Sequence, residues 1–262
     1  MIFILGGGGF IGSAFVRRCV TQGWEHRVVT RENYAEFAGR RCNLFVNANG
    51  NARKNLATKA PLEDFDASVR SVRKTLIDFP CDTYVYLSSC EVYPDCSSPA
   101  RTCEDQSIDV ARQNPYGLHK YLAEQCVRHA ASRWLVARVG GLVGPAFYKN
   151  AIFDILAGDP LWLDPASEMQ FMATDDAAGI ILNLARDRLA NEVVNVCGKG
   201  TIRLQEVIDF VGAKVMVRPG SPRVVYDVSI DKLSRYVPVP ETRRAVLEFV
   251  QGQRGLVREA GL

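Results

Sequence analysis

The sequence has no long apolar run, no clustered metal-ligand residues and no basic tract. No stretch approaches the roughly 20 consecutive apolar residues that a membrane-spanning helix needs. The net charge is only +3, and paired arginines such as Arg17-Arg18 and Arg243-Arg244 are scattered along the chain rather than interleaved with aromatic residues. Neither a membrane nor a nucleic acid is therefore expected as a partner.

The eight cysteines include no Cys-x-x-Cys pair and do not cluster with the three histidines, so no metal site is expected. Many free cysteines, and an N-terminus without a basic leader, indicate a cytoplasmic protein. Cys90, Cys96 and Cys103 lie close enough in sequence for a regulatory disulfide, but free thiols are the simpler interpretation. The histidines are isolated along the chain and are expected to be structural or surface residues: His26, His119 and His129.

The N-terminal residues do show a specific pattern. An apolar run at 2–5 is followed by four glycines at 6–9, a helical stretch at 10–22 and a second apolar run at 26–30. The glycines at positions 6, 9 and 12 allow the chain to turn, a pyrophosphate to approach the backbone and the helix to pack on the strand. Unpaired N–H groups and the positive end of the helix dipole meet at this turn, which favours a dinucleotide phosphate.

Strands and helices continue to alternate along the chain. The segment 84–89 is almost continuously apolar, as expected for a parallel strand that is covered on both faces. This alternation predicts an α/β protein with a doubly wound parallel sheet, a Rossmann fold. The segments are a strand with a small polar turn at 43–50, a helix at 64–79, a strand at 84–89, a surface loop at 94–114, a helix at 116–131 and a strand at 134–139.

The chain changes character after Pro145, where turns become frequent and the apolar runs become short, as at 215–217 and 224–226. A helix at 175–185 and a strand at 193–196 are expected to return to the main sheet. The predicted division is a dinucleotide-binding Rossmann domain at 1–146 and 175–198, with a small discontinuous substrate-binding lobe at 147–174 and 199–262.

Tyr116 and Lys120 stand four residues apart on a predicted helix, so both lie on one helix face. A nearby ammonium favours a phenolate, and Lys120 is therefore expected to lower the pKa of Tyr116 toward the working pH, where the phenol can move a proton. Ser88 and Ser89 end the preceding strand and are expected to face the same cleft.

Five blocks of sequence, in this order, resemble the extended short-chain dehydrogenase/reductases, the NAD-dependent epimerase/dehydratase family. The resemblance covers roughly the first 145 residues and continues more weakly at 171–176 and 194–196. The blocks are Gly6-x-x-Gly9-x-x-Gly12, the Asn-Ala-Asn-Gly turn at 47–50, Val85–Tyr93, Asn114–Lys120 and Arg138–Pro145.

The resemblance implies that Ser89, Tyr116 and Lys120 are the catalytic residues. Tyrosine would exchange a proton with a sugar hydroxyl while nicotinamide exchanges a hydride, and lysine would hold the ribose. The family's usual substrates are nucleotide-linked sugars, and its members commonly dimerise through the helices that match 64–79 and 116–131. The implied dinucleotide contacts are Gly6, Gly9, Phe10, Ile11, Gly12, Asn47, Ala48, Asn49, Tyr116 and Lys120.

The sequence departs from the family pattern where the adenosine of the cofactor would bind. The second strand ends in Thr30-Arg31 instead of the aspartate that accepts a ribose hydroxyl, and an arginine there favours the 2′-phosphate of NADP. NAD remains the alternative if Arg31 is a solvated surface residue. The chain between Thr30 and Asn43 is also too short for the usual helix, strand and helix, so one element is expected to be missing.

Departures also occur where the substrate would bind. Glu91 stands where dehydratases and decarboxylases of the family often have an acid/base glutamate, but the preceding residue is Cys90 instead of aspartate. Gly141 replaces an asparagine that contacts phosphate in many members. Residues that could bind an anionic substrate, or simply be surface residues, are Asn150, Gln170, Arg218 and Arg223.

Three functions are consistent with this pattern. The first is an NADP-dependent oxidoreductase acting on a nucleotide-activated sugar, in particular a 4-keto sugar reductase. The second is an epimerase or dehydratase that oxidises and re-reduces a bound NAD, with Glu91 as acid or base. The third is a non-catalytic NADP-binding redox sensor. A homodimer is expected by analogy alone.

Overall fold

The computed structural model describes residues 1–51, 54–146, 150–187 and 189–259 of the 262-residue chain. The chain folds into two compact units, each built from separate segments. The predicted division into a dinucleotide-binding domain and a substrate-binding lobe remains a prediction. The first unit is Met1–Pro94, Glu104–Val139 and Ala178–Val196, and the second is Asp95–Cys103, Gly140–Ala177 and Cys197–Leu262.

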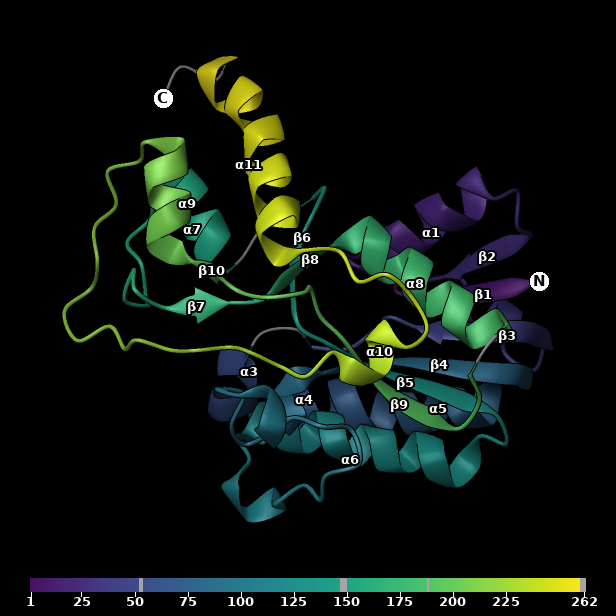
Figure 1. Ribbon diagram of the computed structural model, residues 1–262. Helices are drawn as coiled ribbons and strands as arrows, with labels where there is room; N and C mark the ends of the chain where they lie inside the picture. The colour runs from purple at the N-terminus through teal and green to yellow at the C-terminus, as the bar shows by residue number, and fades with distance from the viewer. Residues whose placement is uncertain (52–53, 147–149, 188, 260–262) are drawn as a thin grey trace. The chain divides into compact units, whose positions relative to one another are not determined.

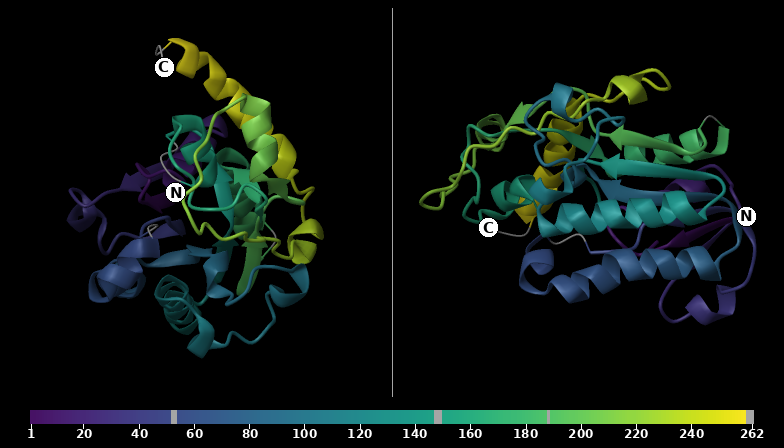
Figure 2. Two further views of the ribbon diagram at one scale, coloured as in Figure 1. Left: turned by 90° about the vertical axis from the view of Figure 1, so that its left-hand side faces the viewer. Right: turned by 90° about the horizontal axis from the view of Figure 1, so that it is seen from below.

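The first unit contains a six-stranded, fully parallel sheet in the order β2-β1-β3-β4-β5-β9 (Figure 1). This confirms the predicted doubly wound α/β fold. Helices α1 and α8 cover one face of the sheet, and α5 and α6 cover the other (Figure 2). The strands are β1 Ile2–Leu5, β2 His26–Val29, β3 Cys42–Asn47, β4 Cys81–Ser89, β5 Trp134–Val139 and β9 Glu192–Val196; the helices are α1 Gly12–Thr21, α5 Ser71–Asp78, α6 Pro115–Ala130 and α8 Thr174–Asp187.

The helix predicted at 64–79 is interrupted. It consists of α4 Pro61–Phe65, a π-helical turn η1 Asp66–Arg70 and then α5. A π turn holds more residues than an α turn, so side chains before it lie on a different face from those after it. Val69 and Val72 are buried as the apolar spacing predicted, whereas Phe65 is 38% exposed.

The sheet ends at β2, and the short connection from β2 to β3 adds no further strand beside it. Residues 30–41 form only the four-residue helix α2 Tyr34–Phe37, in agreement with the expectation of a missing element. Backbone bonds from β1 to the carbonyls of Glu25 and Val29 leave the carbonyls of His26 and Val28 facing the open edge. The Arg27 guanidinium and the Asn33 amide donate to these two carbonyls, which blocks the addition of another strand.

The described part of the second unit has short strands and three longer helices around its own apolar core. The runs predicted at 215–217 and 224–226 form isolated bridges, Leu161 with Val217 and Glu168 with Val225. None of the helices in the described part of the chain combines the length and apolarity that a membrane crossing requires. The paired strands are β6 Gly141–Val143 with β8 Phe171–Ala173 and β7 Glu168–Met169 with β10 Ile202–Arg203; the helices are α7 Ala151–Ala157, α9 Leu204–Val211 and α11 Thr242–Glu259, with a single turn at α10 Asp231–Ser234.

Candidate functional site

The glycine turn after β1 is built from contacts that side chains would prevent. Gly6 has φ +81°, and a Cβ there would lie 3.0 Å from the Ala48 backbone. A Cβ on Gly12 would lie 2.0 Å from the carbonyl oxygen of Gly6, so the start of α1 packs directly on the turn. A Cβ on Gly8 would meet nothing within 4 Å, and Gly8 and Gly9 are exposed. The backbone of these two residues is therefore open to a ligand.

A cavity of about 620 Å³ opens beside this turn. The ten-residue helix α1 has no acidic residue in its first turn, so the positive end of its dipole favours an anion. These features fit the diphosphate of a dinucleotide. The cavity is lined by Leu5, Gly6, Gly7, Gly8, Gly9, Val29, Thr30, Arg31, Glu32, Tyr34, Asn49, Ser71, Lys74 and Thr75.

The 47–51 loop after β3 forms the next part of the site. The side chain of Asn47 is buried and turned inward, where it donates to the hydroxyls of Tyr84 at 2.8 Å and Thr75 at 3.3 Å. Its oxygen accepts from the backbone N–H of Asn49 at 3.1 Å. Asn47 therefore fixes the conformation of the loop from its buried side. Asn49 is the residue of this loop that lines the cavity.

Strand alternation separates the two serines at the end of β4. Ser88 is buried and donates to Glu124 on α6. The Ser89 hydroxyl is hydrogen-bonded to the phenol of Tyr116 and accepts from the backbone N–H of Glu91. Of the two, only Ser89 therefore meets the predicted tyrosine.

The expectation that Lys120 lowers the pKa of Tyr116 is wrong for the polypeptide by itself. Burial raises the pKa of the Tyr116 phenol to about 12; the bond from Ser89 and the charge of Lys54 act against this rise, and the charge of Glu91 adds to it. The ammonium of Lys120 lies 5.9 Å from the centroid of the Tyr116 ring and donates to the carbonyl of Leu87 at 3.1 Å. The phenol is thus held in its protonated form.

Glu91 is largely buried and has two polar partners. The Lys54 ammonium lies 2.6 Å from one carboxylate oxygen, and the Asn114 amide donates to the other at 3.2 Å. The charges of both Lys54 and Glu91 act on the Tyr116 phenol. Sequence reasoning missed Lys54, because only the fold brings α3 (Lys54–Lys59) to the segment after β4.

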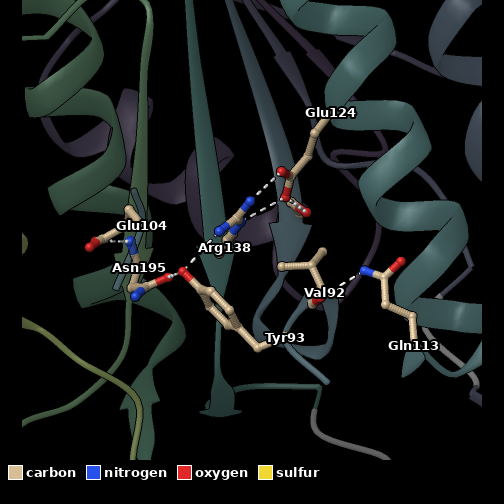
Figure 3. A network of polar contacts seen from close by, with 8 residues as sticks. Val92, Tyr93, Glu104, Gln113, Glu124, Arg138 and Asn195 are labelled. Carbon is tan, nitrogen blue, oxygen red and sulfur yellow. Dashed lines mark hydrogen bonds and ion pairs between the residues drawn. The ribbon is translucent and has the colours of Figure 1, made fainter. Parts of the chain in front are cut away.

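A buried polar network supports the segment that carries Ser89 and Glu91 (Figure 3). The Arg138 guanidinium donates to both carboxylate oxygens of Glu124, at 3.0 and 2.8 Å, and to the hydroxyl of Tyr93 at 2.8 Å. Tyr93 in turn donates to Asn195 on β9 at 2.9 Å. Because Arg138 and Glu124 are buried and paired, removing either one would leave the charge of the other uncompensated. The network therefore anchors the end of β4 to α6, β5 and β9.

Within the second unit, each residue considered for anion binding already has a structural contact. Asn150 caps the N-terminus of α7, and Gln170 bonds to the backbone of Gly198 and Val228. Arg218 stacks on Trp162 at 3.8 Å, and Arg223 pairs with Glu168 at 3.5 Å. These contacts are the ones expected of ordinary structural and surface residues.

The replacement of asparagine by Gly141 has a local explanation. A Cβ on Gly141 would lie 2.5 Å from the Gln170 carbonyl oxygen and 2.7 Å from the Phe171 ring. No larger residue fits against β8 without a shift of the backbone.

Comparisons with known proteins agree with this architecture. The model of the NAD dependent epimerase/dehydratase family matches residues 46–197, more than half of the chain. The chain therefore belongs to this family, and it is an enzyme of the NAD-dependent epimerase/dehydratase class. No curated protein sequence matches it.

Many solved structures share the fold. A UDP-galactose 4-epimerase has a TM-score of 0.78 at 21% identity, with 98% of this chain and 99% of that chain covered. MoeE5 in complex with UDP-glucose and NAD has a TM-score of 0.81 at 15% identity, with the same coverage. The UDP-glucose 4-epimerase of Thermotoga maritima, solved with UDP-glucose, has a TM-score of 0.76 at 16% identity, again over 98% and 99% of the two chains. At these identities the likeness concerns the fold.

Proposed function

We propose that the protein is an NAD(P)-dependent oxidoreductase acting on a nucleotide-activated sugar, and specifically a 4-keto sugar reductase in which Tyr116 is the proton donor. The observation that carries this proposal is the placement of the Tyr116 phenol, which is buried, is bonded to Ser89 and has the Lys120 ammonium 5.9 Å from its ring centroid; burial also raises its pKa to about 12. A phenol with this pKa is protonated at neutral pH and is therefore suited to donate to a developing alkoxide. The nucleotide sugars in structures with this fold support the substrate class.

In the proposed reduction, a hydride is supplied by the reduced nicotinamide when it is bound. The Tyr116 O–H gives its proton to the carbonyl oxygen, and the Ser89 hydroxyl hydrogen-bonds to that oxygen. Lys120 would hold the nicotinamide ribose and its positive charge would stabilise the phenolate that remains.

We further propose NADP as the preferred cofactor. Arg31 lines the cavity at the end of β2, and Lys74 on α5 lines the same cavity. Lys74 pairs with Asp78 one turn away in an exposed contact, which contributes little and can be exchanged for a phosphate. Glu32 favours the alternative, NAD, but its carboxylate is bonded to the side chain of Thr30.

The test is reduction of a panel of nucleotide-linked 4-keto sugars, followed through the loss of NADPH absorbance. Turnover that requires both NADPH and Tyr116 is expected. Tyr93→Phe is unsuitable as a control because Tyr93 belongs to the Arg138 network, so Tyr121→Phe, on the same helix as Tyr116, is the matched control. No turnover with any member of the panel would contradict the proposal.

The ion pair of Lys54 with Glu91 favours a second candidate, an epimerase or dehydratase with bound NAD. A carboxylate held beside the tyrosine is placed to act as acid or base on a sugar ring. This function predicts that the purified protein retains NAD, and that Glu91→Gln loses water elimination but keeps hydride transfer. Protein that is isolated without dinucleotide and prefers NADPH would exclude it.

A further inference from the structure

Asp64 is a completely buried carboxylate that takes no direct part in the proposed proton transfer, although its charge contributes to the raised pKa of the Tyr116 phenol. It lies at the end of α4, next to the π-helical turn η1. The Asn51 amide donates to one oxygen at 2.6 Å, and His119 Nδ1 bonds to the other at 2.6 Å. The Ser68 hydroxyl of η1 contributes a longer bond of 3.4 Å.

The two strong partners of Asp64 belong to the two segments that surround the Lys120 ammonium. Asn51 ends the 47–51 loop, and His119 directly precedes Lys120 on α6. Within that loop Gly50 has φ +128°, and a Cβ on it would lie 3.5 Å from Lys120 Nζ and 3.8 Å from the Ala67 carbonyl oxygen of η1. One carboxylate therefore joins the loop, the π turn and the helix at the place where the ammonium lies.

Simple packing does not account for a carboxylate at this position. Burying a charge is unfavourable unless hydrogen bonds compensate it, and an apolar side chain could join α4 to α6 without that cost. Hydrogen bonds differ from apolar contacts because they fix distance and direction. The π turn is a second irregularity at the same point, and such turns occur frequently at functional sites.

We propose that Asp64 is a positioning residue: through Asn51 and His119 it fixes the 47–51 loop against α6, and so sets where Lys120 meets the nicotinamide ribose of a bound dinucleotide. This inference rests on the proposed function, because it takes the ribose to be the partner of Lys120. His119 is the second positioning residue, because its hydrogen bond to Asp64 fixes the part of α6 that carries Lys120.

The test compares His119→Leu with His119→Asn. The asparagine amide lies at nearly the same distance from the backbone as Nδ1 and can donate to Asp64, whereas leucine cannot. Affinities for NADPH and NADH are measured by fluorescence, and affinities for 2′,5′-ADP and 5′-AMP, which lack the nicotinamide ribose, by competition. His129→Leu, an exposed position on the same helix, is the control.

We expect His119→Leu to weaken binding of the preferred dinucleotide about 5- to 10-fold and to leave the adenosine fragment within about twofold. His119→Asn and His129→Leu should resemble the wild type. Asn51→Ala provides an independent check if His119→Leu folds poorly. It should likewise weaken binding of the dinucleotide more than binding of the adenosine fragment.

Two outcomes overturn the inference. In one, dinucleotide and fragment affinities fall together in step with the melting temperature, which indicates a packing role. In the other, His119→Asn is as impaired as His119→Leu. If the wild-type protein binds neither dinucleotide, the proposed function itself fails, and this result is distinguishable because it appears before any substitution is made.

Discussion

Two groups of residues lie at the carboxyl ends of the parallel strands, one around Tyr116 and one around Arg31. They differ in whether the family model matches the segments that carry them. The Tyr116 end, meaning Ser89, Glu91, Tyr116 and Lys120, lies inside the segment that the family model matches. The Arg31 end, meaning Arg31, Glu32, Tyr34 and Lys74, includes the short connection after β2, which precedes the match. Proton transfer requires fixed geometry, whereas an adenosine can be bound by walls of different composition.

The difference is visible in burial. Tyr116 and Lys120 are 8% and 5% exposed and are held by hydrogen bonds of the sheet and α6. Arg31 is exposed, and the Lys74 side chain is 61% exposed. The residues proposed for proton transfer are thus fixed by the core, while the residues proposed for cofactor selectivity are side chains that water can reach.

The largest expected effect comes from Tyr116→Phe, which removes the proton donor and leaves the ring in place. Turnover should fall about 10²- to 10⁴-fold with cofactor affinity little changed, as measured by steady-state kinetics and NADPH titration. A redox sensor would keep its output with this substitution. Unchanged turnover would show that Tyr116 is not the proton donor, and the contrast between the Tyr116 end and the Arg31 end would then be lost.

A second substitution tests the glycine turn at residues 6–12, where the diphosphate of a dinucleotide is proposed to bind. Gly12→Ala places a Cβ against the Gly6 carbonyl oxygen, and the resulting backbone shift should cost about 1–3 kcal/mol of stability and weaken dinucleotide binding more than tenfold. Gly8→Ala is the matched control, because its Cβ meets no protein atom. It should keep the melting temperature, so equal melting temperatures for both variants would contradict this account.

Arg31→Ala tests the Arg31 end by itself. Loss of one charged contact to a 2′-phosphate should weaken NADPH binding about tenfold and leave NADH unchanged, and salt should reduce the difference. Lys74→Ala should act in the same direction, with Arg73→Ala on the same helix as the control. If Glu32→Gln weakens NADH binding while Arg31→Ala has no effect, the cofactor is NAD.

The smallest effect is on alkaline stability. Burial raises the pKa of Tyr116 to about 12, and burial together with Asp78 raises the pKa of Tyr34. Phenols with raised pKa values stabilise the fold below their unfolded pKa of about 10 and lose this contribution as the pH rises through the folded value. Melting temperatures should therefore fall above about pH 10, and Tyr116→Phe should reduce the slope.

The sequence by itself determined the parallel sheet and brought Tyr116, Lys120 and Ser89 to attention. Glycine spacing, apolar strands and a four-residue helical interval are local patterns, and local patterns can be read along a chain. The missing element before Asn43 was also evident, because it concerns only the length of a connection.

Tertiary structure decided the environment of those residues. It placed Lys54 against Glu91, Lys74 and Arg31 on the wall of one cavity and Asp64 between the 47–51 loop and α6, and it showed that burial outweighs the Ser89 bond and the Lys54 charge in setting the pKa of the Tyr116 phenol. These contacts join residues far apart in sequence. Electrostatic energy depends on distance and solvent exposure in the folded state, neither of which residue spacing contains.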